Sequence, residues 1–332
     1  MNAEPGKHPP PAPEHRLSAV LFDRDLQGHP VELAKLGERA FEDDQLLWID
    51  VLGKSDELPD VVTRYGIERD HLQPRDIGVI TNVGDWSYLY ARALNSAAGR
   101  KLVGESLVVA IGHNVVITAH HRPIGFLTAV IENEAEQLHV GSLQAGSFAA
   151  SLLDRMLTDY LDARDEFESA VDRIELLVLR RPQSKHLSEL QQLRRHASKL
   201  RRYLAMQRDM FDAVARPDFD PGQTQLVARH WQLLSARYSK VMMSVESARE
   251  LVNGSFEVYT SRVAHRTSET MRLLTVVTVV LGSLAVTAGA LGMNFKAEVF
   301  ESGDTGFWWA IGGMLGFAAL AIAVGIKLLT RR

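Results

Sequence analysis

The sequence has no cysteine among its 332 residues. This absence excludes disulfide bonds, thiolate metal sites, iron–sulfur clusters and cysteine nucleophiles. Any metal ion that the chain handles therefore meets oxygen, imidazole or thioether groups. Such groups favour a hard cation that passes through the protein, rather than a soft cation that is held tightly.

An excess of positive charge is also missing, as are the common catalytic motifs. The formal net charge is -4, whereas nucleic-acid binders usually carry surplus positive charge. The sequence has no P-loop, GxGxxG or HExxH pattern and nothing that resembles a catalytic triad. We therefore expect neither an enzyme nor a nucleic-acid-binding protein, and we expect no cofactor.

Charge is absent altogether from two long stretches near the C-terminal end. Residues 273–295 read LLTVVTVVLGSLAVTAGALGMNF, and residues 305–326 read TGFWWAIGGMLGFAALAIAVGI. A bilayer core about 30 Å thick needs roughly 20 apolar residues of helix. Two adjacent charge-free stretches of this length are rare in a soluble domain, so we predict two transmembrane helices rather than two buried core helices.

The charges that flank these stretches predict their orientation. Basic residues precede the first stretch and follow the second: Arg262, Arg266, Arg272, Lys327, Arg331 and Arg332. The connection between them is mostly acidic: Glu298, Glu301 and Asp304, against Lys296. The positive-inside rule then places both termini in the cytoplasm and the short loop outside. Trp308 and Trp309 would lie at the outer membrane interface.

Residues 17–140 show the mixed pattern of a small α/β domain. Five runs are strand-like: Leu17–Phe22, Leu46–Val51, Trp86–Leu94, Ser106–Ile111 and Asn114–Ala119. Gly112 and His113 predict a hairpin turn between the last two runs. Helical patterns lie between Glu57 and Tyr65 and between Ile124 and Glu134. The proline-rich, polar residues 1–16 are expected to be disordered and show no secretory leader pattern.

Residues 141–272 are predicted to form long helices. The first has an apolar seam at spacings of four and three: Ala149, Leu153, Met156, Tyr160, Ala163, Phe167, Ala170, Ile174 and Leu177. It is expected to end at Arg181–Pro182, and a second helix to run from Leu187 to about Ala215. A third helix, from about Gln225, has a seam of its own: Trp231, Leu234, Tyr238, Val241, Val245, Ala248 and Val252. No proline interrupts it, so we predict that it continues into the first membrane span.

The end of the first span reads Gly292, Met293, Asn294 and then Phe295. The sequence resembles the CorA family of divalent-metal transporters. The resemblance rests on this motif, the two C-terminal spans, the long preceding helix, the run Met271–Val276 and the WIDV run Trp48–Val51. The resemblance implies a homopentamer in which five first spans line a pore, second spans form an outer ring and cytoplasmic domains form a funnel. It also suggests a multi-pass protein among the lipids of a prokaryotic inner membrane.

The resulting expectation is an α+β chain in seven segments. They are the disordered N-terminus 1–16, the cytoplasmic α/β domain 17–140, the helical stalk 141–272, the pore-lining span 273–295, the outer loop 296–304, the second span 305–327 and the cytoplasmic tail 328–332.

The tripeptide at the outer end suits a hydrated cation. Asn294 offers a neutral amide oxygen, and Gly292 lets backbone carbonyls turn towards a ligand. Mg²⁺ gives up its water reluctantly, and a ring of amides and carbonyls can hydrogen-bond a hydrated ion without stripping it. The carboxylates of the loop (Glu298, Glu301 and Asp304) would concentrate cations near the mouth. A helix C-cap explains Gly and Asn equally well, and we expect the motif to serve both purposes.

Helical spacing back from Asn294 traces a candidate pore face. It contains Gly289, Ala285, Gly282, Thr278, Leu274, Met271 and Ser268. Large apolar side chains at Met271 and Leu274 indicate a constriction near the cytoplasmic end, which would gate by dewetting. The other reading is that small residues on this face allow close helix packing, which is also our interpretation of Gly312 and Gly316 on the second span.

Several positions depart from the usual family pattern and leave the ion open. Leu291 stands where an aromatic residue is common, Ser268 where an Asn is common, and Phe300 where a loop Glu is common. A mid-span Met-Pro pair with a nearby Thr is replaced by Gly282-Ser283 and Ala285. The zinc-transporting ZntB branch, or a transporter of Co²⁺ or Ni²⁺, shares the architecture. Uptake, efflux, proton coupling and a membrane-anchored scaffold or sensor all stay open.

Two further groups of polar residues are candidate metal sites. His120 and His121 are adjacent at a strand end, so their side chains point apart and a surface position is expected. Asp159, Asp162 and Glu166 share one helix face and could attract or sense cations, but a solvated helix face is the expected role.

Overall fold

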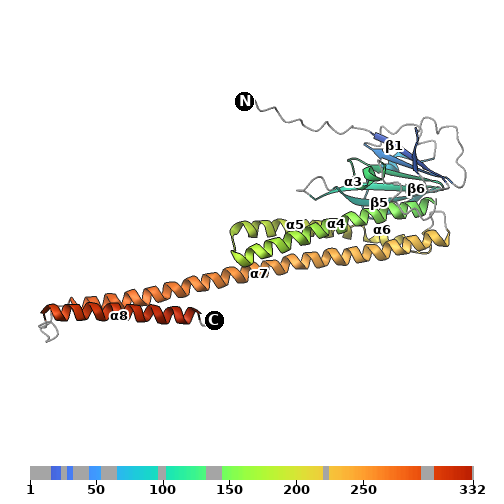
Figure 1. Ribbon diagram of the computed structural model, residues 1–332. Coiled ribbons are helices and arrows are strands. Elements are labelled where there is room, and N and C mark those ends of the chain that lie inside the picture. The colour runs from blue at the N-terminus through green and yellow to red at the C-terminus, as the bar shows by residue number, and fades with distance from the viewer. Residues whose placement is uncertain are drawn as a thin grey trace, which may run out of the picture. The chain divides into compact units, whose positions relative to one another are not determined.

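The computed structural model describes residues 16–23, 28–32, 45–53, 66–95, 102–131, 144–219, 224–292 and 303–330. The chain divides into two compact units (Figure 1). Unit 1 comprises Met1–Ile174 and Lys185–Ser255, and unit 2 comprises Glu175–Ser184 and Phe256–Arg332. Two long helices, α4 (Ala145–Arg180) and α7 (Gln225–Leu291), contribute residues to both units.

Unit 1 contains a seven-stranded sheet with the strand order β2-β1-β3-β7-β6-β5-β4. The strands are β1 (Arg16–Phe22), β2 (Gly28–Pro30), β3 (Leu46–Leu52), β4 (Ile80–Val83), β5 (Trp86–Asn95), β6 (Val103–Ile111) and β7 (Val115–His120). Neighbouring strands are antiparallel except for β3 and β7, which are parallel. All five predicted strands are confirmed, and Gly112 donates its N–H to the Val115 carbonyl (2.8 Å) at the predicted hairpin.

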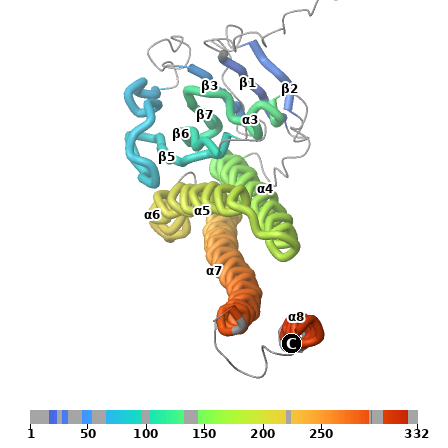
Figure 2. Tube along the Cα trace, turned by 90° about the vertical axis from the view of Figure 1, so that its left-hand side faces the viewer, coloured from blue at the N-terminus to red at the C-terminus, as the bar shows by residue number. Residues whose placement is uncertain are grey.

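Both faces of the sheet are buried, which is why its central strands read as continuous apolar runs. One face, which includes Trp48 and Val116, packs with the helices in the main core. Figure 2 shows α4, α5 (Ser184–Ala205) and α6 (Arg208–Ala213) on the same side of the sheet. The other face, which includes Ile49 and Ile117, packs with Leu72 of the short 3₁₀ helix η2 (Arg69–Leu72).

Helix α4 ends at Arg180, just before Pro182, as predicted. Its predicted seam is confirmed through Phe167 and at Ile174, although Ala163 and Ala170 are only half-buried, and it is wrong at Leu177. Val171 and Val178 are buried beside Ala170 and Leu177, and Leu177 is 41% exposed. The prediction used a strict alternation of four and three, whereas a straight helix of 3.6 residues per turn drifts away from a 3.5-residue repeat.

Helix α7 extends without interruption over 67 residues, as predicted from the lack of proline. All seven members of its predicted seam, from Trp231 to Val252, are at most 3% exposed. The helix α3 (Gly125–Ala129) lies within the range predicted after Ile124. The helix predicted between Glu57 and Tyr65 and the end of the one predicted to reach Glu134 lie outside the described residues.

The second long helix was predicted to run from Leu187 to about Ala215, and this is wrong. It breaks at Met206 and Gln207, between α5 and α6. The fully buried Gln207 side chain accepts a hydrogen bond from the Arg92 N–H (2.9 Å) and donates to the Tyr203 carbonyl (2.9 Å). A strand of the sheet therefore holds the side chain that interrupts the helix.

The Gln207 contact gives a direct stability prediction. Gln207→Ala leaves the buried Arg92 N–H without its acceptor, so the free energy of unfolding should fall by about 2–3 kcal/mol. Unfolding of the full chain in detergent measures this change. Gln192→Ala, at an exposed position on α5, is the matched control and should have no effect; equal stability of the two variants would contradict the role of Gln207.

Candidate functional site

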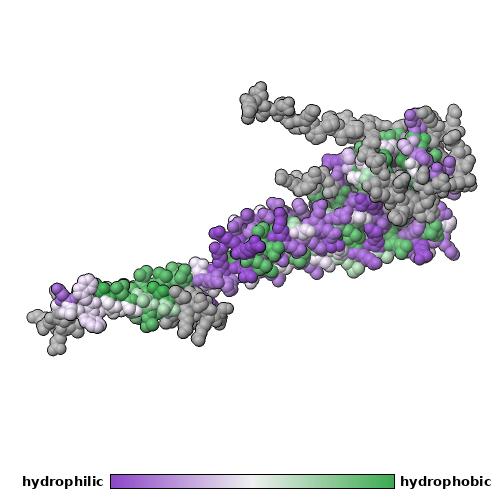
Figure 3. All heavy atoms as spheres, in the orientation of Figure 1, coloured by the Kyte–Doolittle hydropathy of each residue, from purple (hydrophilic) through white to green (hydrophobic). Residues whose placement is uncertain are grey.

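Unit 2 consists mainly of the C-terminal part of α7 and the helix α8 (Gly303–Thr330). In Figures 1 and 2, α8 runs alongside the end of α7. By length and composition both helices could cross a membrane, and only 6% and 0% of their apolar windows are buried in the chain. Core helices would be covered, so this exposure argues against the alternative of two buried core helices. Figure 3 shows hydrophobic atoms gathered on these helices.

The hydroxyl groups in the apolar part of α7 are satisfied within the helix itself. Each donates to the carbonyl four residues earlier: Thr275 to Met271 (2.8 Å), Thr278 to Leu274 (2.8 Å), Ser283 to Val279 (2.8 Å) and Thr287 to Ser283 (2.9 Å). A hydroxyl whose proton is bonded in this way costs little in an apolar environment. The threonines and serine of this stretch are therefore compatible with a membrane span.

One face of this part of α7 is covered and the opposite face is open. Val280 is 7% exposed, and Val276, Ser283 and Leu284 are half-buried on the same side. All of the predicted pore-lining residues are exposed: Ser268, Met271, Leu274, Thr278, Gly282, Ala285 and Gly289. At 100° per residue, they lie on the side of the helix away from Val280. The predicted line thus follows the face that the single chain leaves without a partner.

At the C-terminal end of α7 the structure describes only part of the motif. Helix α7 ends at Leu291, and the Gly292 N–H bonds to the Ala288 carbonyl (2.9 Å). This closing bond is consistent with a helix terminus at the motif. Met293, Asn294, Glu298 and Glu301 lie outside the described residues, so the predictions for them stay predictions.

The start of α8 carries the remaining predicted features of the outer mouth. Asp304 lies exposed in the first turn, where a carboxylate interacts favourably with the helix dipole. Trp308 and Trp309 are 68% and 81% exposed. Such exposure suits rings that contact an interface outside the chain.

At the N-terminal end of the apolar stretch, the side chains change abruptly from charged to apolar. Arg262, Arg266 and Arg272 are all exposed. Met271 and Leu274 beside them are 59% and 58% exposed, although both are large apolar residues. A band of exposed apolar side chains therefore lies next to a band of exposed basic side chains on α7.

The acidic face of α4 provides no metal site in the part of the chain that the structure describes. Asp162 and Glu166 are exposed, as expected for a solvated face. Burial raises the pKa of Asp159 to about 6, and Asp162 adds to this, while Arg155 opposes it. No group of three or more His, Asp or Glu residues that could hold a metal is found among the described residues.

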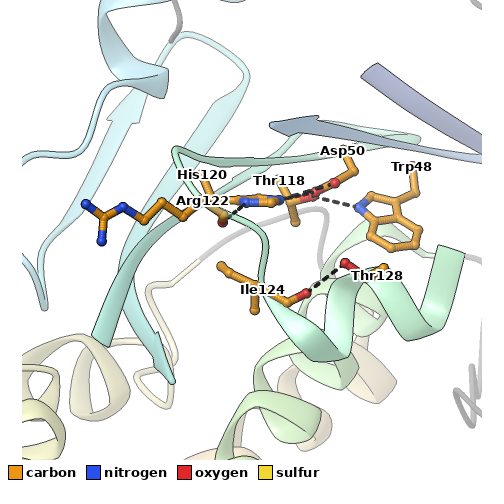
Figure 4. Close-up of polar contacts among 7 residues, drawn as sticks. All are labelled: Trp48, Asp50, Thr118, His120, Arg122, Ile124 and Thr128. Carbon is orange, nitrogen blue, oxygen red and sulfur yellow. Dashed lines mark hydrogen bonds and ion pairs between the residues drawn. The ribbon is translucent and has the colours of Figure 1, made fainter. Parts of the chain in front are cut away.

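The expected surface position of the adjacent histidines is wrong for His120. His121 is exposed, but His120 is 4% exposed and lies 3.1 Å, from Nε2 to Oδ1, from the buried carboxylate of Asp50 (Figure 4). The cause is the sheet order, which puts β7 beside β3 in the middle of the sheet. Asp50 lies in the WIDV run on the same face as the buried Trp48. A charged residue at that position is a signal in the sequence for a buried partner.

These features define a class of protein: a mixed α/β unit followed by a long helix that becomes apolar and a second apolar helix. Residues 43–326 match the family described as CorA-like Mg2+ transporter protein. This match covers most of the sequence, so the chain belongs to the CorA-like family.

Two curated relatives match part of the chain. The cobalt/magnesium transport protein CorA of Thermotoga maritima is 28% identical over 146 residues, 44% of this chain and 41% of that protein. The divalent cation transporter CmaX of Pseudomonas aeruginosa is 30% identical over 164 residues, 48% of this chain and 46% of that protein. The chain therefore matches less than half the length of each relative.

A solved structure matches nearly the whole chain. The complete structure of the CorA magnesium transporter from Methanocaldococcus jannaschii has a TM-score of 0.72, with 92% of this chain and 96% of that chain covered. The identity is 19%, so the likeness establishes the fold: an α/β domain, a long helix and a C-terminal helix.

Proposed function

We propose that the chain forms a homopentameric, channel-like pathway for divalent cations, chiefly Mg²⁺, across a prokaryotic inner membrane. Membership of the CorA-like family supports the class of cargo. The observation that carries the pathway is the open face of α7, where the predicted pore-lining residues lie opposite the covered face around Val280. No nucleic acid and no cofactor enter the proposal.

A single copy cannot enclose an ion path with one helix. Five copies arranged around a cyclic axis would bring five open α7 faces together, and each face would meet its neighbours. The α8 helices would then form the outer ring against lipid, with the exposed Trp308 and Trp309 at the outer interface. The partners are therefore further copies of the chain, membrane lipids and the transported ion.

Selection is assigned to the outer mouth, at Gly292, Met293 and Asn294. A ring of Asn294 amide oxygens would hydrogen-bond the water shell of Mg²⁺, which the ion keeps. Carboxylates of Glu298, Glu301 and Asp304 would raise the local cation concentration. This arrangement passes a hydrated ion without the tight binding that would trap it.

Opening and closing are assigned to Met271 and Leu274. Large apolar side chains that surround a narrow path exclude water, and a path without water does not conduct ions. With both termini in the cytoplasm, a divalent cation that moves inward across about 100 mV gains roughly 4.6 kcal/mol. Uptake therefore needs no pump.

The same pathway could instead carry Zn²⁺, Co²⁺ or Ni²⁺, inward or outward, with or without a coupled proton. The departures at Leu291 and Ser268 favour keeping this second candidate, because both positions lie along the proposed ion path. A membrane-anchored scaffold or sensor is the alternative from another class, and it requires no ring. The size of the detergent-purified protein distinguishes the ion pathway from the scaffold or sensor. A pentamer supports the pathway, and a monomer or dimer supports the scaffold.

The first functional prediction concerns the outer mouth. Asn294→Ala should abolish ion flux into liposomes and leave the oligomer intact, because it removes the amide ring without changing the helix interface. Asn82→Ala, at an exposed position on β4, is the matched control and should transport normally. Normal flux through Asn294→Ala would refute the assigned selectivity site.

The second functional prediction concerns the hydrophobic gate. Leu274→Asn should raise resting flux several-fold, since a polar side chain stabilises water in the constriction. Leu273→Asn is the control: Leu273 is 56% exposed, but it lies on the side of α7 near the covered face. The gate is disproved if both variants behave alike in the same liposome assay at equal protein amounts.

A further inference from the structure

The face of the sheet that packs on the helices carries a buried row of polar side chains. Trp48 and Asp50 come from β3, and Thr118 and His120 come from β7 (Figure 4). All four are at most 6% exposed. Polar groups buried this deeply are costly unless hydrogen bonds satisfy them, so the direction of each hydrogen bond carries information.

The direction can be followed from Trp48. Its indole N–H can only donate, and it donates to the Thr118 hydroxyl oxygen (3.0 Å). The Thr118 hydroxyl in turn donates its proton to Oδ1 of Asp50 (2.5 Å). Asp50 is therefore an acceptor here, which is the role of an ionised carboxylate.

His120 completes the row with both of its ring nitrogens. Nε2 lies 3.1 and 3.2 Å from the two Asp50 oxygens. Nδ1 lies 2.6 Å from the Arg122 carbonyl oxygen, which can only accept. With Asp50 ionised, each nitrogen faces an acceptor, and each therefore carries a proton. This geometry fits a positively charged imidazolium, buried against a carboxylate.

The surrounding charges agree with that state. Burial lowers the pKa of His120. Asp50 on β3, the Arg122 carbonyl and Glu105 on β6 together outweigh burial, so the pKa lies above its ordinary value. The adjacent helix α3 has no titratable residue. The Arg122 side chain extends away from the ring in Figure 4.

We propose that His120 is a buried proton switch: its protonated form stabilises the connection between β7 and α3. The Nδ1–H bond holds the chain at Arg122, two residues before Ile124 and the start of α3. Phe126 and Leu127 of α3 belong to the main core. Loss of the proton leaves one ring nitrogen facing an acceptor with no hydrogen between them, which loosens this connection.

The sign of the pH effect follows from the raised pKa. Because the folded chain holds the proton more tightly than the unfolded chain, the stabilisation is complete below about pH 6.5. It is lost as the pH rises through the pKa of the folded state. The cytoplasmic domain should therefore weaken towards alkaline pH.

Thermal unfolding of the full chain in detergent tests the proposal. Between about pH 6.5 and pH 8.5, the wild-type Tm should fall by several degrees, and in His120→Gln this fall should largely disappear. His121→Gln is the matched control, since His121 is exposed and bonds through Nδ1 only to the Gly53 carbonyl (3.1 Å); it should keep the wild-type profile. Equal pH profiles for wild type and His120→Gln would overturn the switch.

Ring ¹⁵N spectra of the wild-type chain decide the matter even if His120→Gln does not fold. At pH 7, one of the 12 histidines should show both ring nitrogens protonated. A spectrum without such an imidazolium would refute the proposal.

Discussion

The continuous backbone hydrogen bonding of α7 is the constraint on which the other features depend. The helix includes 67 residues, and no proline occurs between Gln225 and Leu291 to interrupt it. In unit 1 its seam from Trp231 to Val252 is buried in the bundle. In unit 2 the same helix contributes the apolar stretch, whose covered face surrounds Val280. One unbroken helix therefore presents both the buried seam in unit 1 and the candidate pore line in unit 2, each at helical spacing.

In unit 1, buried hydrogen bonds fix positions that apolar packing alone would leave variable. Gln207 binds the backbone of Arg92 and ends α5, and the Tyr160 hydroxyl donates to the Arg92 carbonyl (2.7 Å). The Asp50–His120 pair fixes β3, β7 and the turn into α3 in the same manner. Both networks are buried, so each broken bond leaves a costly unsatisfied group. They define where the helices meet the sheet.

Local patterns predicted much of this fold because they repeat over many residues. The five longer strands follow from strand-like apolar runs, and the whole seam of α7 follows from helical apolar periodicity. The short edge strands β2 and β4 have three and four residues, too few to show a pattern. The break at Gln207 and the burial of His120 depend on partners 115 and 70 residues away in sequence. In the candidate site, helical spacing predicted the line of residues on α7, whereas Met293 and Asn294 lie outside the described residues.

The proposed pathway passes divalent cations, chiefly Mg²⁺, through a hydrated path at its outer mouth. The decisive measurement is the flux of Mg²⁺, Zn²⁺, Co²⁺ and Ni²⁺ into liposomes that contain the purified wild-type chain, with and without a proton gradient. We expect Mg²⁺ flux that follows the membrane potential and does not require a proton gradient. Zn²⁺ flux that depends on the proton gradient, without Mg²⁺ flux, would contradict it.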